Sequence, residues 1–137
     1  MTYFNVQSIT YIGELPETAE GLGGHENQVG TNCKGFKKQE PKDLFVTIDA
    51  DYEHYINKKF VFKFQVTTTY LVVGFDKNQF DKELQFMRFL LIKSFAHLQA
   101  ILAAKFQDKG EHMFIPDEPD YSSSHEAMRK LLWELYK

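Results

Sequence analysis

The first half of the chain follows the two-residue period of β-strands. In LFVTIDADYE, residues 44–53, one face carries the apolar residues Leu44, Val46, Ile48, Ala50 and Tyr52. Residues 3–12 and 60–75 share the enrichment in aromatic and β-branched residues, with less regular alternation. The glycine-rich stretch before residue 41 predicts a long connection with one short edge strand at about 28–37. A turn at residues 57–59 predicts that the last two strands form an antiparallel hairpin.

Beyond the strands, the hydrophobic period changes to that of an α-helix. Apolar residues recur at steps of three and four, namely Phe80, Leu84, Met87, Leu91, Phe95, Leu98, Leu102 and Phe106. Asn78 is the expected N-cap, and Gly110 is the expected end. A helix of this length spans about 45 Å, so we expect a kink or a break near residues 87–90. Ser123 and Glu126 form a capping-box pattern before a short terminal helix.

Strands first and helices last predict an α+β two-layer sandwich with an antiparallel sheet. The length of 137 residues predicts a single domain over residues 1–137. A net charge of −3 argues against nucleic acid or an anionic membrane as the main partner, because both require a basic surface. No apolar run reaches the roughly 20 residues of a membrane span, and the amino terminus lacks the pattern of a signal peptide. These features predict a cytoplasmic protein.

The sequence offers no arrangement typical of an enzyme, a metal site or a cofactor site. The five histidines are scattered, without the i, i+4 spacing of a helical metal site. His97 lies on the flank of the apolar stripe, and we interpret it as a boundary residue rather than a catalytic base. Cys33 is the single cysteine, so no intramolecular disulfide can form, and we interpret it as an incidental thiol.

Three carboxylates, Asp49, Asp51 and Glu53, share the second face of the strand at residues 44–53. Neighbours on that face are about 7 Å apart, since each residue advances the strand by about 3.4 Å. General acid–base chemistry would need a pocket that raises one of their pKa values, and the pattern implies no such pocket. Two interpretations stay open: a solvated outer face, or an acidic docking patch for a basic partner.

The chain is rich in aromatic residues, which make up 15% of it and include 13 phenylalanines. One face of residues 60–75 carries Phe60, Phe62, Phe64, Val66, Tyr70 and Val72, and we expect it to face the core. The opposite face also carries apolar residues, namely Val61, Leu71, Val73 and Phe75. A strand that is apolar on both faces is covered on both sides, and we expect a second subunit to provide part of the cover.

The run from Lys59 onward resembles the SecB-like superfamily, the fold of the bacterial export chaperone. The parts that carry the resemblance occur in the same order and at similar spacing. They are a long last strand with F-x-F-x-V followed by Tyr70 and Gly74, a helix with Phe95-Ala96-His97, then Gly110, an apolar stretch ending in Pro116, and a terminal helix. The chain is most similar to an uncharacterised Gram-positive family within that superfamily.

The resemblance implies a four-stranded antiparallel Greek-key sheet, followed by a long helix and a short C-terminal helix on one face. It also implies a non-enzymatic homodimer or homotetramer that binds extended apolar segments of unfolded polypeptides, as a chaperone does. By position, the groove candidates are Phe95, Leu98, Met113, Phe114 and Ile115. The chain departs from the chaperone at residues 96–99, where it lacks a proline and an arginine, and in its glycine-rich insertion.

A helix-grip carrier of an apolar small molecule is the alternative function. Such folds also end on a long helix that closes a curved sheet over a cavity, but they usually have six or more strands, whereas this sequence predicts four. A co-purified ligand would favour the carrier.

Overall fold

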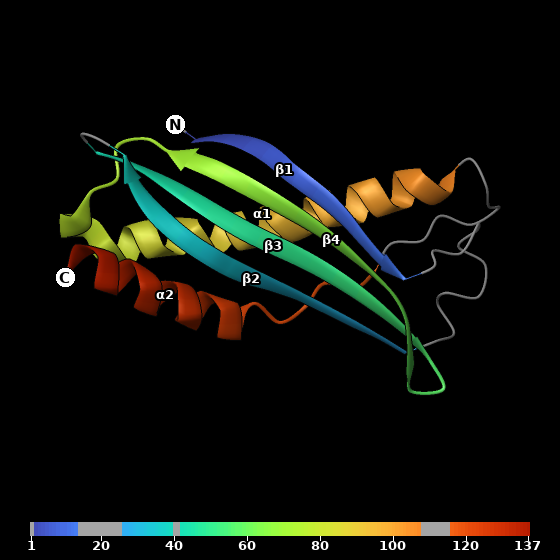
Figure 1. The fold of residues 1–137 in the computed structure, drawn as a ribbon. Coiled ribbons are helices and arrows are strands. Elements are labelled where there is room, and N and C mark those ends of the chain that lie inside the picture. Colours follow the sequence, from blue (N-terminus) through green and yellow to red (C-terminus); the bar gives the residue numbers. More distant parts are fainter. Residues whose placement is uncertain (1, 14–25, 40–41, 108–115) are drawn as a thin grey trace.

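A computed structural model describes residues 2–13, 26–39, 42–107 and 116–137, and these form a twisted antiparallel sheet with two helices (Figure 1). The strands are β1 (Thr2–Gly13), β2 (Glu26–Gln39), β3 (Asp43–Ile56) and β4 (Lys59–Val72). A 3₁₀ turn, η2 (Lys77–Gln79), precedes the long helix α1 (Phe80–Gln107), and the shorter helix is α2 (Ser122–Tyr136). The α+β class, with an antiparallel sheet, a long helix and a short C-terminal helix, is confirmed.

The sheet is built around the β3–β4 hairpin. β2 pairs antiparallel with β3, and β1 runs antiparallel along the other side of β4, which gives the order β1-β4-β3-β2. Asn57 and Lys58 connect β3 to β4 with φ angles of 51° and 65°. Positive φ at both central residues is typical of the tight turns whose twist matches that of the strands they join. The predicted hairpin is therefore confirmed.

The edge strand β2 is longer than the sequence pattern indicated. It has 14 residues, Glu26–Gln39, where a short strand at about 28–37 was expected. Its glycines and lysines have low strand propensity, but β3 offers a regular partner along its whole length, and pairing overrides propensity. The register shifts between Cys33 and Gly35, which is the irregularity that a glycine-rich edge strand introduces.

The core lies between α1 and one face of the sheet. The predicted apolar face of β3 is completely buried, as are Phe62, Phe64 and Val66 of β4. From α1 the core receives the predicted stripe, of which the buried members are Leu84, Met87, Leu91, Phe95, Leu98 and Leu102. Since α1 packs against β2, β3 and β4, one helix covers most of this face (Figure 1).

The expected break in α1 near residues 87–90 does not occur, because α1 is continuous over 28 residues. At 1.5 Å per residue it is about 42 Å long. A strand of 14 residues is about 46 Å long at 3.3 Å per residue. The expectation of a break was wrong because it assumed a smaller sheet, whereas the long strands support α1 over its full length.

Phe60 was expected on the core face of β4, but its side chain is 48% exposed. The pairing between β3 and β4 shifts register between His54 and Tyr55, so that Tyr55 lies opposite Phe60. The two rings contact edge to face, with centroids 6.0 Å apart. A register shift next to the hairpin turn therefore moves this phenylalanine out of the core.

The start of α1 differs from the prediction that Asn78 is its N-cap. Asp76 takes that role for the preceding turn, because its Oδ1 accepts a hydrogen bond from the Asn78 backbone N–H at 2.9 Å. The turn η2 then leads into α1 at Phe80. Gly110, the expected end of the helix, lies outside the described residues.

The capping box predicted for α2 does not form. Asp120 Oδ1 accepts a hydrogen bond from the Ser122 backbone N–H at 2.9 Å, which satisfies one of the free amides at the start of the helix. Glu126 instead pairs with Arg129, three residues later on the exposed side of α2, at 2.6 Å. The S-x-x-E pattern was correct in locating a helix start and wrong about the residues that cap it.

α2 lies beside α1 and packs against β2 (Figure 1). Ser124 Oγ donates a hydrogen bond to the backbone carbonyl of Thr31 at 2.5 Å and accepts one from Thr31 Oγ1 at 3.1 Å. His125 Nε2 lies 3.1 Å from the carbonyl oxygen of Leu84 in α1. These contacts fix α2 to both neighbours and close that side of the core.

Candidate functional site

The three predicted carboxylates lie on the open face of the sheet, the face turned away from α1. Each occupies a position between core residues of β3, and each faces a polar residue of β4 in the strand register. Thr67 Oγ1 donates to Asp49 Oδ1 at 2.5 Å, and Gln65 Nε2 donates to Asp51 Oδ1 at 2.7 Å. We call the pairs Asp49–Thr67, Asp51–Gln65 and Glu53–Lys63 the polar ladder.

The last pair of the polar ladder, Glu53–Lys63, is partly exposed. Lys63 Nζ lies 3.6 Å from Glu53 Oε1, and Tyr55 Oη donates to Glu53 Oε2 at 2.6 Å. The hydrogen bond to Glu53 raises the pKa of the Tyr55 hydroxyl. Glu53 is therefore held by two neighbours from its own sheet.

Burial decides the electrostatics of the ladder. Asp49 is only 7% exposed, and burial raises the pKa of Asp51 above its usual 3.8, against the opposing effects of Gln65 and Lys63. Among the residues that the structure describes, no group of three or more His, Cys, Asp or Glu side chains could hold a metal ion. The ladder can join two strands and present Asp51 and Glu53 at the surface, whereas Asp49 lies too deep for direct contact.

The predicted groove residues fall into two sets. Phe95 and Leu98 lie on the inward face of α1, and their side chains are completely buried in the core. Met113, Phe114 and Ile115 lie outside the described residues. Where the chain is described again, the Pro116 carbonyl accepts a hydrogen bond from Gln99 Nε2 at 2.8 Å, so the segment returns alongside α1. The groove itself stays a prediction.

The two nucleophile or base candidates have the environment of structural residues. His97 is half-buried on the flank of α1, and burial together with Lys93 lowers its pKa. Cys33 is buried, and burial raises the pKa of its thiol to about 11. At neutral pH such a thiol is almost entirely protonated and therefore a poor nucleophile.

Sequence reasoning missed the outward face of α1. We call its exposed residues Phe89, Ala96, Ala100 and Ala104 the outer stripe. Phe89 is 53% exposed, and its ring stacks against Phe86 with centroids 6.3 Å apart. The steps of seven and four residues place the stripe along one line of the helix. The core stripe is the stronger pattern in the same residues and hides this second pattern of small and aromatic residues.

The helical stretch Lys77–Lys105 is long and apolar enough to cross a membrane by length and composition. The core helix of a soluble protein passes the same test, and here the inward face of α1 forms the core. The outer stripe and the half-buried residues Phe86, Ile92 and Ile101 provide the rest of the apolar character. Large exposed apolar surface on a folded chain typically marks a contact surface.

Protein-family models and curated proteins were compared with the chain, and neither comparison found a match. We therefore infer a function from the surfaces described above.

Proposed function

We propose that the chain is a non-enzymatic SecB-like oligomeric protein that binds extended apolar polypeptide segments and acts as a chaperone. The observation that carries the proposal is the outer stripe of α1, an apolar helix face that the described part of the chain leaves uncovered. A helix that carries apolar residues on its exposed face as well as on its core face is typical of a chain that contacts a second surface.

The strand order supports the fold part of the proposal. β2, β3 and β4 follow one another as antiparallel neighbours, and β1 lies beside β4 rather than beside β2. Three consecutive strands and a fourth that reaches them by a long connection make up a Greek key. This arrangement, with α1 and α2 after the sheet, is the one expected of a SecB-like chain.

For the oligomer, we assign the contact to the outer stripe of two copies. Alanine at positions 96, 100 and 104 lets two helices approach closely, and Phe89 supplies the largest apolar side chain on that line. The contact would produce a homodimer, or a homotetramer if a second surface also pairs. The two copies would bury the aromatic pair of Phe86 and Phe89.

For the client, we assign the contact to Met113, Phe114 and Ile115, which precede the segment held against α1 at Pro116. Phe95 and Leu98 then support the groove from the core. A basic partner, if one docks on the open face, would meet Asp51 and Glu53. A helix-grip carrier is the weaker choice, because completely buried side chains fill the space between α1 and the sheet.

The oligomer is tested by light scattering on the wild type and on two matched variants. Phe89→Glu introduces a charge into the outer stripe, and we expect it to lower the solution mass toward that of one chain. Phe60→Glu is the control, since Phe60 is similarly exposed, at 48% against 53%, but lies at the β3–β4 hairpin. A wild type that is strictly monomeric refutes the oligomer.

The chaperone activity is tested by the aggregation of a chemically denatured test protein diluted into buffer. We expect the wild type to suppress light scattering near an equimolar ratio, and Phe114→Ser to suppress it less. Phe60→Ser is the control, and circular dichroism verifies that both variants fold. Equal suppression by both variants would refute the assigned client contact, and an absence of suppression by the wild type would refute the chaperone activity.

A further inference from the structure

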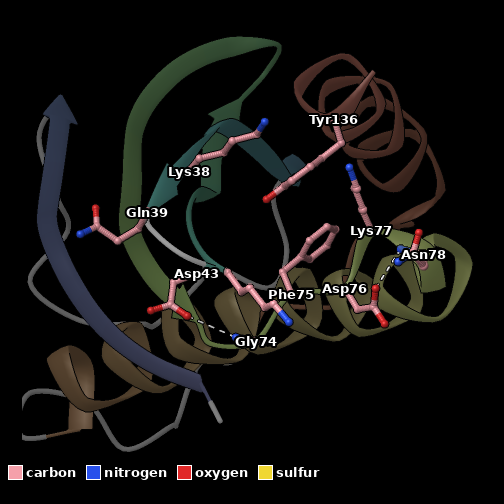
Figure 2. Close-up of a pocket in the computed structure, with 10 residues that line it drawn as sticks. Lys38, Gln39, Asp43, Gly74, Phe75, Asp76, Lys77, Asn78 and Tyr136 are labelled. Atoms are coloured by element: carbon pink, nitrogen blue, oxygen red, sulfur yellow. Dashed lines mark hydrogen bonds between the residues drawn. The ribbon is translucent and has the colours of Figure 1, made fainter.

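A polar hollow of about 720 Å³ lies at the end of the sheet where β2 and β3 meet (Figure 2). Five parts of the chain contribute to it: the end of β2, the start of β3, the residues after β4, the turn η2, and α2. Its charged lining residues are Lys38, Lys42, Asp43, Asp76 and Lys77. The volume is within the range of sites for small molecules, which is about 300 to 1,000 Å³.

An aromatic pair forms one wall of the hollow. Phe75 is buried, and its ring stacks on that of Tyr136 with centroids 4.8 Å apart and 22° between the planes. Lys38 Nζ lies 4.6 Å from the centre of the Tyr136 ring, and Figure 2 shows Tyr136 between Lys38 and Lys77. Burial raises the pKa of Tyr136, so its hydroxyl is a neutral hydrogen-bond donor at physiological pH.

The two carboxylates of the hollow are engaged by its own backbone. Asp43 Oδ1 accepts a hydrogen bond from the Gly74 N–H at 3.3 Å, and Asp76 Oδ1 accepts one from the Asn78 N–H at 2.9 Å (Figure 2). Gly74 has a φ of 76°, a conformation that favours glycine and turns the chain here. Each carboxylate therefore has a structural task, which is to hold the rim in place.

The lysines have no corresponding task. The ammonium groups of Lys42 and Lys77 form no hydrogen bond or ion pair with any residue in the described ranges. Within the part of the chain that the structure describes, the ammonium group of Lys38 contacts the face of the Tyr136 ring. The hollow thus holds three cations against two anions, on a chain whose net charge is −3.

We propose that this hollow binds a small soluble polyphosphate or phosphorylated molecule, with Lys38, Lys42 and Lys77 as the ligands of its phosphate oxygens. A phosphate chain presents several acceptors, and the three ammonium groups with the Tyr136 hydroxyl present several donors at separate points of the wall. The lining of the site contains no residue of the outer stripe, so the proposal does not depend on the proposed function.

The test is calorimetric titration with inorganic triphosphate at constant ionic strength. We expect saturable binding of one triphosphate per chain, and a double variant Lys42→Gln/Lys77→Gln that binds at least about tenfold more weakly, since each lost charge-assisted contact costs about that factor. The control is Lys59→Gln/Lys130→Gln, which removes two exposed charges elsewhere, and we expect a change of less than about twofold. Circular dichroism verifies that both double variants fold.

Adenosine triphosphate is the second probe, and it separates recognition of the phosphate chain from recognition of a base. Comparable affinity for both probes supports the proposal. Binding of the nucleotide without binding of triphosphate overturns it, because the site would then recognise the base. Equal weakening in the two double variants, or no saturable binding of triphosphate at millimolar concentration, also overturns it.

Discussion

Replacing Phe95 with alanine tests whether α1 and the sheet form one packed core. The side chain of Phe95 projects from α1 into the core and is completely buried, so the change removes a ring that solvent does not reach. Such a ring buries roughly 150 Å² or more of apolar surface, and at about 25 cal/mol/Å² this is worth about 4 kcal/mol. Measured losses for phenylalanine to alanine in cores are about 3 to 5 kcal/mol, because the surrounding side chains close the cavity only in part.

The assay is urea denaturation followed by far-ultraviolet circular dichroism, with the free energy of unfolding extrapolated to water. The protein concentration stays fixed, because association would add to the apparent stability. Phe60→Ala is the matched control, since it removes the same ring from a position that is 48% exposed, and we expect a loss of less than about half as much. Equal losses at Phe95 and Phe60, or a loss at Phe95 below about 1 kcal/mol, would refute the packing described for α1.

Three further predictions concern polar groups of the sheet. Thr67→Val removes the hydrogen-bond donor to the buried carboxylate of Asp49, and we expect the free energy of unfolding to fall by about 1.5 to 3 kcal/mol. Thr69→Val is the control, because it breaks a neutral and less buried hydrogen bond to Thr47, and it should cost under about 1 kcal/mol in the same denaturation assay. The folded-state pKa of Asp51 is raised, so the wild type loses stability as the pH rises through that pKa, whereas an asparagine at this position does not titrate. We therefore expect the free energy of unfolding of Asp51→Asn to increase relative to that of the wild type between pH 3 and pH 7. A difference between the two that decreases with rising pH would contradict this. The thiol of Cys33, with a pKa of about 11 in place of 9.0, should react with a disulfide reagent roughly 100-fold more slowly in the native protein than in denaturant, measured by absorbance.

The strands with a strong pattern were predictable from the sequence, and β3 is the clearest example. Its alternation from Leu44 to Tyr52 correctly gave the face that packs on α1. Because β3 is a central strand and α1 packs on one of its faces, the residues of that face are buried along most of the strand, and they are apolar for that reason. The stripe of α1 was predictable for the same reason, because one face of the helix lies in the core.

Features that depend on pairing between distant residues were not predictable from local patterns. The register shift opposite Tyr55 exposes Phe60, and no single-strand pattern contains the position of such a shift. The length of β2 and the unbroken course of α1 depend on how far β3 and β4 extend. Asp76 and Asp120 act as caps from positions that the local motifs did not favour.

The same distinction between local patterns and long-range pairing applies to the candidate sites. Alternation placed Asp49, Asp51 and Glu53 on one face, but their partners on β4 follow only from the register. The outer stripe could have been found, since its alanines recur every four residues after Ala96. The hollow around Tyr136 could not, because it joins residues that are far apart in the sequence.

The pair of hydrogen bonds between Ser124 and Thr31 also has a consequence for biosynthesis. Residues 93 apart must both be present before α2 can cover β2. At translation speeds of about 5 to 20 residues per second, Ser124 is added about 5 to 20 s after Thr31. During that interval the nascent chain can begin to pair its strands, but α2 does not yet cover the core side of β2, where Val29 and Phe36 lie. The chain therefore presents a hydrophobic edge while it is being made, and α2 completes the fold after the elements that it covers.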